Sequence, residues 1–248
     1  MSLKSSDFQH AYILHTRPYR ETSLLVDLLT EQDGRVSAVA RGAKRKKSLS
    51  KATFQPFVLL AINWFGSSEL VTLKQTEVID SSIRLTGKAL LSAFYINELL
   101  CKLLHRFDAA QAVFSAYQQV IHQLANLEND SATEAVLRYF EKALLDALGY
   151  GLHLTELPDG AKVLADQYYF YGLDGYFSVY GGHCPQTGES SSLSLGPRVF
   201  KGSELLGIAQ DAFYDKPILQ AAKRLMRFAF ALLLGEKSLN SRELFVML

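Results

Sequence analysis

The chain has 248 residues, of which 48% are hydrophobic and 21% are charged, and its formal net charge is +1. This composition is typical of one large or two ordinary folded domains, and it excludes a disordered tail or linker. Two cysteines are too few for a disulfide-rich secreted scaffold, and the opening residues MSLKSSDFQHAY lack the apolar core of a signal peptide. The apolar runs are too short to cross a bilayer. We therefore expect a cytoplasmic protein.

The first 80 residues have the composition of short strands, rich in β-branched and aromatic side chains and separated by glycine-containing turns. The predicted strands are 11–16, 22–30, 35–41, 56–65 and 69–79. In the third strand, alternation places Val36, Ala38 and Ala40 on one face. Arg35 and Arg41 then share the opposite face. Five strands without an intervening helix favour a small closed barrel, and the oligonucleotide-binding (OB) barrel is the expected fold.

From about Thr86 the apolar residues recur with the period of an α-helix. The predicted helices are 86–107, 109–127, 131–151, 202–213, 215–235 and 240–245. Between them, aromatic runs around a Gly-Leu-Asp-Gly turn predict a hairpin or small irregular insert at about 152–198. We thus predict an α+β protein. Its five-stranded OB domain spans 1–82, and its α-helical domain spans 83–248 and is interrupted by the insert.

Positive charge is concentrated in RGAKRKKSLSK, residues 41–51, which holds six cations and no acid. Residues 1–80 carry 11 Lys and Arg against 8 Asp and Glu, whereas residues 81–248 carry 15 against 17. Single-stranded nucleic acid is bound by cations that follow the phosphates and by aromatic faces on which bases stack. The candidate DNA-binding residues are Arg17, Tyr19, Arg20, Arg35, Arg41, Lys44, Arg45, Lys46, Lys47 and Lys51.

The basic stretch has other interpretations that the sequence leaves open. It could be a solvated loop that aids solubility, or a nuclear localisation signal, which short Lys/Arg runs often match by chance. The chain could also be a non-catalytic adaptor whose basic loop binds an acidic protein partner. The position of the stretch within a five-strand barrel favours nucleic acid, because loops between OB strands are where such cations usually lie.

Patterns that indicate catalysis or a bound cofactor are absent from the sequence. It contains no phosphate-binding glycine loop, no complete nucleophile elbow and no C-x-x-C pair. His183 and Cys184 are adjacent, which gives two poorly placed ligands where a tetrahedral zinc site needs four. We expect no enzyme activity and no cofactor, although an unrecognised nuclease or ligase-like enzyme stays a rival interpretation.

A second group of cations lies in the predicted helical half. Lys223, Arg224 and Arg227 follow a helical spacing, and Arg138 borders an apolar stripe on another helix. Isolated helix cations are usually solvated. A cation beside an apolar groove, however, suits an acidic and hydrophobic peptide.

Several separated segments resemble the RecO family of bacterial recombination mediators. The first is LHTRPYRETSLLVDLLTEQDGRVSAVARGAKRKKS, followed by QPF. Later ones are YINELL (95–100), LRYFEKALLDALGYG (137–151) and SRELF (241–245). The resemblance extends from about Tyr12 to Phe245, and the segments occur in the family's order.

The resemblance implies an N-terminal OB barrel on a helical domain and a non-enzymatic role in DNA repair and recombination after DNA damage. RecO-like proteins bind single- and double-stranded DNA, anneal complementary strands, and act with RecR to help RecA replace single-strand binding protein (SSB). They also bind the acidic, Phe-ending tail of SSB through the helical domain. On this basis the expected partners are DNA, RecR and the SSB tail, with a functional link to RecA, in the nucleoid-associated cytoplasm. The candidate tail-binding residues are Arg138, Lys223, Arg224 and Arg227.

The insert departs from the pattern of many RecO family members, which carry a four-cysteine zinc ribbon there. This sequence has only Cys184 in that region. It therefore resembles a zinc-free branch of the family, and we expect no bound metal.

Overall fold

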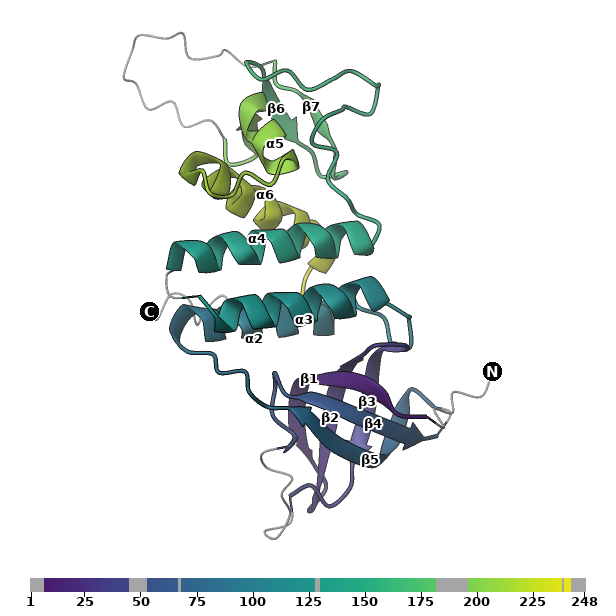
Figure 1. Ribbon diagram of the computed structural model, residues 1–248. Helices are drawn as coiled ribbons and strands as arrows, with labels where there is room; N and C mark the ends of the chain where they lie inside the picture. Colours follow the sequence, from purple (N-terminus) through teal and green to yellow (C-terminus); the bar gives the residue numbers. More distant parts are fainter. Residues whose placement is uncertain are drawn as a thin grey trace. The chain divides into compact units, whose positions relative to one another are not determined.

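The structure is a computed structural model that describes residues 7–44, 53–66, 68–127, 130–181, 196–237 and 239–241. The chain forms two compact units (Figure 1). The first comprises residues 1–130 together with 237–248, and the second comprises residues 131–236. The predicted division into domains at residue 82 stays a prediction.

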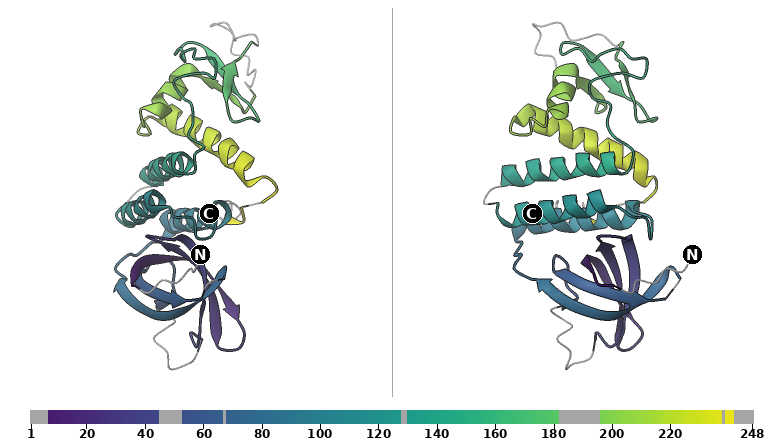
Figure 2. Two further views of the ribbon diagram at one scale, coloured as in Figure 1. Left: turned by 90° about the vertical axis from the view of Figure 1, so that its right-hand side faces the viewer. Right: turned by 45° about the vertical axis from the view of Figure 1, so that its right-hand side comes forward.

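The first unit contains a closed barrel of five strands, as the sequence predicts, and Figure 2 shows it from two sides. The strands are β1 (Gln9–Tyr19), β2 (Ser23–Thr30), β3 (Gly34–Ala40), β4 (Leu59–Phe65) and β5 (Leu70–Asp80). They are hydrogen-bonded in the order β1-β2-β3-β5-β4, and β4 closes the barrel on β1. All pairs are antiparallel except β3 with β5, which is parallel. The α+β class and the OB-like barrel are confirmed.

The barrel core is built from alternate residues of the strands. Its fully buried members include Ile13, Leu28, Leu60 and Ile62. Val36, Ala38 and Ala40 also lie in this core, so the alternation predicted for β3 is confirmed. The intervening side chains of β3 consequently point away from the core, and this sets the position of the two arginines at its ends.

Two helices, α2 (Gly87–Leu103) and α3 (Gln111–Ala125), also belong to the first unit. The buried Tyr12 ring of β1 lies 5.1 Å from the ring centroid of Tyr117 on α3. The buried Asn97 side chain of α2 donates to the Leu14 carbonyl at 3.0 Å and accepts from the Tyr117 hydroxyl at 2.8 Å. These contacts satisfy a buried amide, and they join the barrel to α2 and α3 through polar groups.

The second unit combines helices with a small sheet. Its helices are α4 (Asp130–Ala147), α5 (Gly202–Ala209) and α6 (Lys216–Leu234). Its strands are β6 (Tyr168–Tyr171), β7 (Phe177–Val179) and β8 (Val199–Lys201), in the order β7-β6-β8. The hairpin predicted at Gly-Leu-Asp-Gly is confirmed, because Tyr171 pairs with Phe177 across that turn.

The ends of α6 follow the signals in the sequence. The Asp215 carboxylate accepts from the Ile218 backbone N–H at 3.4 Å, Pro217 lies in the first turn, and Gly235 caps the C-terminus. Within the described part of the chain, no helix combines the length and apolarity that a bilayer span requires.

Candidate nucleic-acid interface

A cleft of about 720 Å³ opens at one end of the barrel, where β1, β2 and β3 reach their ends. It is lined by Tyr19, Arg20, Glu21, Thr22, Ser23, Val39, Arg41, Gly42 and Thr72. Tyr19 pairs with Ser23 across the tight β1–β2 turn, and Arg20 adopts a left-handed φ of 51° within that turn. The turn therefore directs two of the sequence-predicted residues into the same cleft as Arg41.

Two arginines near the cleft each lie against an aromatic ring. The guanidinium carbon of Arg20 is 5.2 Å from the ring centroid of Tyr19, and that of Arg41 is 5.7 Å from the ring centroid of Phe65. Both separations are within the range of cation–π contact. Arg20 and Arg41 are exposed, and Phe65 is 48% exposed, so both charged groups and part of the Phe65 ring are accessible to solvent.

Two further exposed cations are adjacent, in the strand or through hydrogen bonds, to residues that line this cleft. Arg17 lies two residues before Tyr19 on the same face of β1. The Lys44 ammonium donates to the Arg20 carbonyl at 3.4 Å, and the Lys44 backbone N–H donates to the Thr22 carbonyl at 3.0 Å. These contacts bring Lys44 to the β1–β2 turn, directly before the rest of the basic stretch.

Phe65 and Lys74 are not among the residues that the sequence predicts. Phe65 lies against Arg41, and Lys74 is two residues along β5 from Thr72, which lines the cleft. Lys74 is exposed and is the extra residue of a β-bulge, because Trp64 pairs with Leu73 while Asn63 pairs with Gln75. Bulges at barrel rims redirect side chains in this way. The consecutive polar residues Lys74 and Gln75 interrupt the alternation of β5, and this interruption is a local signal of the bulge. Nothing local marks Phe65, which is the last residue of β4.

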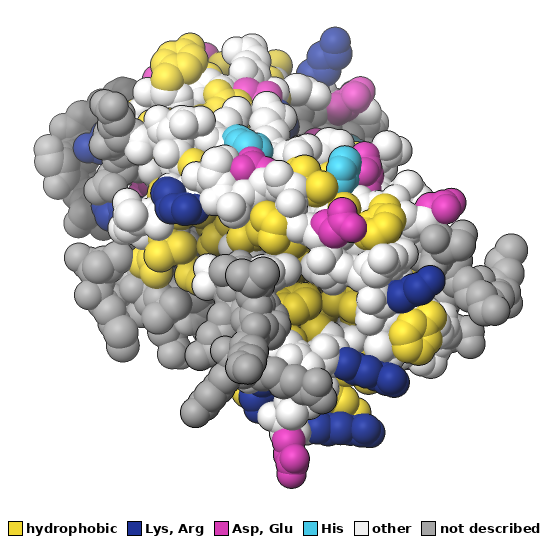
Figure 3. Space-filling view, turned by 60° about the horizontal axis from the view of Figure 1, so that its bottom comes forward, with side chains coloured by type: hydrophobic (Ala, Val, Ile, Leu, Met, Phe, Trp, Pro, Cys, Tyr) yellow, Lys and Arg dark blue, Asp and Glu magenta, His cyan; other side chains and the backbone are white. Residues whose placement is uncertain are grey.

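Figure 3 brings the barrel end of the molecule forward. Lys and Arg side chains gather along one edge of this face, hydrophobic side chains lie between them, and an acidic side chain lies nearby. Among the residues that line the cleft, Glu21 is the acidic one. The remaining members of the predicted set, Arg45, Lys46, Lys47 and Lys51, lie outside the described residues.

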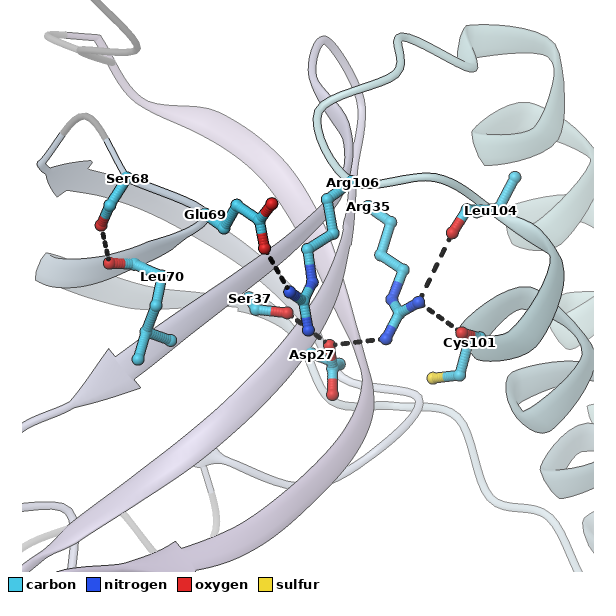
Figure 4. Close-up of polar contacts among 9 residues, drawn as sticks. All are labelled: Asp27, Arg35, Ser37, Ser68, Glu69, Leu70, Cys101, Leu104 and Arg106. Carbon is cyan, nitrogen blue, oxygen red and sulfur yellow. Dashed lines mark hydrogen bonds and ion pairs between the residues drawn. The ribbon is translucent and has the colours of Figure 1, made fainter.

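Arg35 does not join the cleft, although its parity on β3 matches that of Arg41. Its guanidinium donates to the Asp27 carboxylate at 3.0 Å and to the backbone carbonyls of Cys101 and Leu104 at the end of α2 (Figure 4). Asp27 also accepts from the Ser37 hydroxyl at 2.6 Å. Arg35 thus neutralises a buried carboxylate and binds the carbonyl end of a helix, where a cation is favoured. Its observed contacts join barrel to helix.

Cys101, beside this joint, is not a reactive thiol. Burial raises its pKa to about 12, a shift that nearby Arg35 opposes and that Asp27 and Glu98 reinforce. A thiol with so high a pKa has almost no thiolate at neutral pH. The interpretation of Cys101 as a small apolar helix residue agrees with this environment.

Glu98 of α2 binds residues 240–241, a C-terminal segment that belongs to the first unit. Its two carboxylate oxygens accept from the backbone N–H groups of Asn240 and Ser241, at 2.9 and 2.8 Å. Burial alone would raise its pKa, but the hydrogen bonds from Lys102, Ser241 and Asn240 outweigh that effect and lower the pKa to about 2. Glu98 therefore ties residues 240–241 to α2.

The four cations predicted for the helical half have different environments. Arg138 is only 6% exposed and pairs with Glu141 at 2.8 Å. Arg224 pairs with Glu204 at 3.4 Å and lies over the Phe200 ring. Lys223 and Arg227 are exposed one turn apart on α6, and Lys223 pairs with Glu134 of α4 at 3.1 Å. Lys223 and Arg227 are therefore accessible to a ligand, whereas Arg138 is buried.

Metal-ligating side chains do not converge in the described part of the chain, where no three His, Cys, Asp or Glu side chains approach as a ligand group would. His183 and Cys184 lie outside the described residues. The absence of zinc stays a prediction.

Comparison with known proteins identifies the family. Residues 7–82 match the family model "Recombination protein O N terminal", and residues 84–243 match "Recombination protein O C terminal". The chain belongs to the RecO family. Proteins named DNA repair protein RecO are similar over nearly their whole length. The Coxiella burnetii (strain RSA 331) relative is 41% identical over 94% of this chain and 95% of its own. The Pectobacterium atrosepticum relative is 38% identical over 96% of this chain and 92% of its own.

Membership of the RecO family confirms the resemblance found in the sequence and supports a role in DNA repair. The exposed cations at the barrel end have the charge that phosphate groups of DNA would attract. The individual contacts still have to be argued from the geometry.

Proposed function

We propose that this RecO chain is a non-enzymatic DNA repair and recombination mediator that binds single- and double-stranded DNA through the barrel cleft. The observation that supports this most directly is the group of exposed cations around the cleft. Arg20 and Arg41 line the cleft, and Lys44 contacts the Arg20 carbonyl at its edge. Arg17 and Lys74 are exposed, and each is two residues along its strand from a lining residue, Tyr19 and Thr72 respectively. The stretch that continues from Lys44 adds Arg45, Lys46, Lys47 and Lys51.

The binding would be mainly to the sugar–phosphate backbone. Cations that neutralise phosphates release condensed counterions, so affinity falls with salt at a slope of about −0.7 per phosphate on a single strand. Such contacts hold a strand without reading its bases. Arg35 has a different task in this proposal: its guanidinium is engaged by Asp27 and by helix carbonyls, so it supports the barrel and does not touch DNA.

Strand annealing follows from the same charges. Two complementary strands repel each other, and a basic surface that holds both at once screens that repulsion. Lys44, the described residue that begins the run 44–47, contacts the Arg20 carbonyl at the cleft edge. We expect annealing to need the cleft cations together with the run that follows Lys44 in the sequence.

The test is charge reversal at two cleft positions. Arg20→Glu with Arg41→Glu should weaken binding of labelled oligonucleotides at least tenfold at moderate salt. The control is Lys162→Glu with Lys216→Glu, two exposed cations of the second unit, which makes the same change in net charge. Equal effects of the two double variants would reduce the proposal to non-specific electrostatics. No effect of either would overturn the binding site.

The basic stretch has its own test. Reversal of Lys44, Arg45, Lys46 and Lys47 together should abolish annealing of complementary oligonucleotides. Unchanged annealing by this quadruple variant would contradict a role for the stretch.

Gel shifts with the wild-type chain separate the mediator from its rivals. An adaptor with an acidic protein partner gives no shift, and a nuclease cleaves labelled DNA when a divalent metal is added.

A second contact is proposed for the second unit, to the acidic, Phe-ending tail of SSB. Arg227 and Lys223 are exposed on α6 and accessible to a carboxylate. A tail could reach Arg138 only by replacing Glu141 as its partner, because that pair is buried. A carboxylate–Arg contact contributes about 1.5–3 kcal/mol. Arg227→Ala should weaken binding of an SSB-tail peptide about tenfold or more, and wild-type affinity in both Arg227→Ala and Arg138→Ala would place the groove elsewhere.

The same proposal includes the action with RecR on the bacterial chromosome. With RecR present, the chain should speed the assembly of RecA on SSB-covered single-stranded DNA. The Arg20→Glu, Arg41→Glu double variant should lose this effect, because the mediator can no longer hold the DNA beside SSB.

A further inference from the structure

We propose that Phe65 and Tyr19 are stacking platforms for unpaired bases, and that they give the barrel cleft a preference for single-stranded DNA over duplex. This role rests on the proposed DNA binding and adds a discrimination that cations alone do not provide. Phosphates are present on both forms of DNA, so the exposed arginines and lysines attract either. Base faces are accessible only in a single strand, because in a duplex they are stacked on one another.

Phe65 is exposed, Tyr19 is half-buried at the cleft, and each ring has a cation beside it. Phe65 is 48% exposed at the end of β4, whereas Trp64 beside it is 3% exposed and faces the barrel core. An exposed phenylalanine ring gains favourable free energy when a ligand covers it, because apolar surface is then removed from water. The Arg41 guanidinium lies over the Phe65 ring, as Arg20 lies over Tyr19. Each ring thus has a cation positioned for the phosphate next to a stacked base.

The strand register places both rings on the outer face of the barrel, on β1 and β4. Tyr19 is paired with Ser23 at the start of β2, and Phe65 is paired with Thr72, which is paired in turn with Val39. Arg41 follows β3 directly, two residues after Val39, and lies over the Phe65 ring. Residues directly opposite in a ladder share a face, and Ala38 and Ala40 of β3 face inward, so Val39, Thr72 and Phe65 lie on the outer surface.

The ladder neighbours of the two rings line the cleft. Ser23, the partner of Tyr19, and Thr72, the partner of Phe65, are both lining residues, as is Arg41. The two rings therefore flank the cleft. The base stacked on Tyr19 and the base stacked on Phe65 would bracket phosphates held by Arg20 and Arg41.

The experiment compares Phe65→Leu with wild type on two probes. One is an oligodeoxythymidylate of roughly 16 nucleotides, and the other is a hairpin duplex of matched phosphate number. Loss of one stacked base should raise the Kd for the single strand about tenfold and leave the duplex Kd within about twofold. The salt slope should stay at the wild-type value, because no phosphate contact is removed. Phe65→Tyr should restore single-strand affinity.

The matched control is Phe170→Leu, which makes the same substitution at a strand residue of the second unit that is 38% exposed; both probes should bind it like wild type. Fluorescence of Trp64, the single tryptophan, checks that the barrel of each variant is folded. In addition, a 5-iodouracil oligonucleotide should photocrosslink the wild-type chain at Tyr19 or Phe65.

The possible outcomes separate this role from the proposed function. If Phe65→Leu weakens both probes equally, or neither, while wild type binds DNA, the stacking role is overturned and DNA binding by the cations stands. If crosslinks map only outside Tyr19 and Phe65, the stacking role is also overturned. If wild type binds neither probe, the proposed function itself fails.

Discussion

The clearest perturbation of the first unit is Arg35→Met, which keeps the aliphatic stem and removes every donor. In the wild type the guanidinium bonds to Asp27 at 3.0 Å and to the carbonyls of Cys101 and Leu104. The Arg35 and Asp27 side chains are 16% and 12% exposed. After the change, the Ser37 hydroxyl is the one remaining partner of Asp27 seen among the described residues.

The cost can be estimated from this geometry. Removing one partner of a fully buried pair costs about 3–5 kcal/mol, and the residual exposure reduces this to roughly 3 kcal/mol. For a chain of this size, that lowers the unfolding midpoint by roughly 6–12 °C. Thermal unfolding followed by circular dichroism measures the effect. Asp27→Asn in the Arg35→Met background should recover part of the loss, because it removes the unpaired carboxylate.

The same variant distinguishes the supporting role from DNA contact. Below its unfolding transition, Arg35→Met should bind single-stranded DNA within about twofold of wild type. Arg41→Met is the matched control, since Arg41 is exposed: it should keep wild-type stability and lose affinity with a slope shallower by about 0.7. Wild-type stability together with weakened DNA binding in Arg35→Met would refute the supporting role and make Arg35 a direct contact.

Three further predictions concern the first unit. The folded pKa of Glu98 is about 2, below its ordinary value of 4.5, so the stability it contributes is complete above about pH 4.5 and is lost as the pH falls towards 2. Glu98→Gln should therefore flatten the curve of unfolding free energy against pH between these values. An unchanged curve would contradict the hydrogen bonds to residues 240–241. Gly34→Ala should cost at least about 2 kcal/mol in denaturant unfolding, because a Cβ there would meet the Asp108 carbonyl at 1.8 Å with φ at +64°; a neutral effect would mean that the loop yields. Cys101 should resist iodoacetamide at pH 8 in the native chain and react after denaturation, so rapid native labelling would contradict a pKa of about 12.

Much of the fold could be predicted from the sequence because it depends on local patterns. The alternation of Val36, Ala38 and Ala40 reveals which face of β3 is buried, and the turn residues separate neighbouring strands. Pro217 and Gly235 mark the ends of α6. These signals act over a few residues, so they are readable without knowing what packs against them.

The site could be predicted only in part, because its members depend on distant partners. Arg35 and Arg41 are equivalent by their position in the strand alternation. Arg35, however, donates to the carbonyls of Cys101 and Leu104, which are 66 and 69 residues away, and no local pattern encodes these contacts. Phe65 becomes relevant only because Arg41, far along the chain, lies over its ring. Arg138 is different: Glu141 lies at i+3 on the same helix, and that spacing signals an ion pair in advance.

The salt dependence of oligonucleotide binding by the wild-type chain tests most directly whether the barrel cations hold phosphates. With Arg17, Arg20, Arg41, Lys44 and Lys74 each contacting one phosphate, the log–log slope of affinity against salt should be about −3.5 or steeper. In the double variant Arg20→Glu, Arg41→Glu it should become shallower by about 1.4 or more. A slope near zero for the wild type, or no binding even at very low ionic strength, would contradict the proposed grip on DNA.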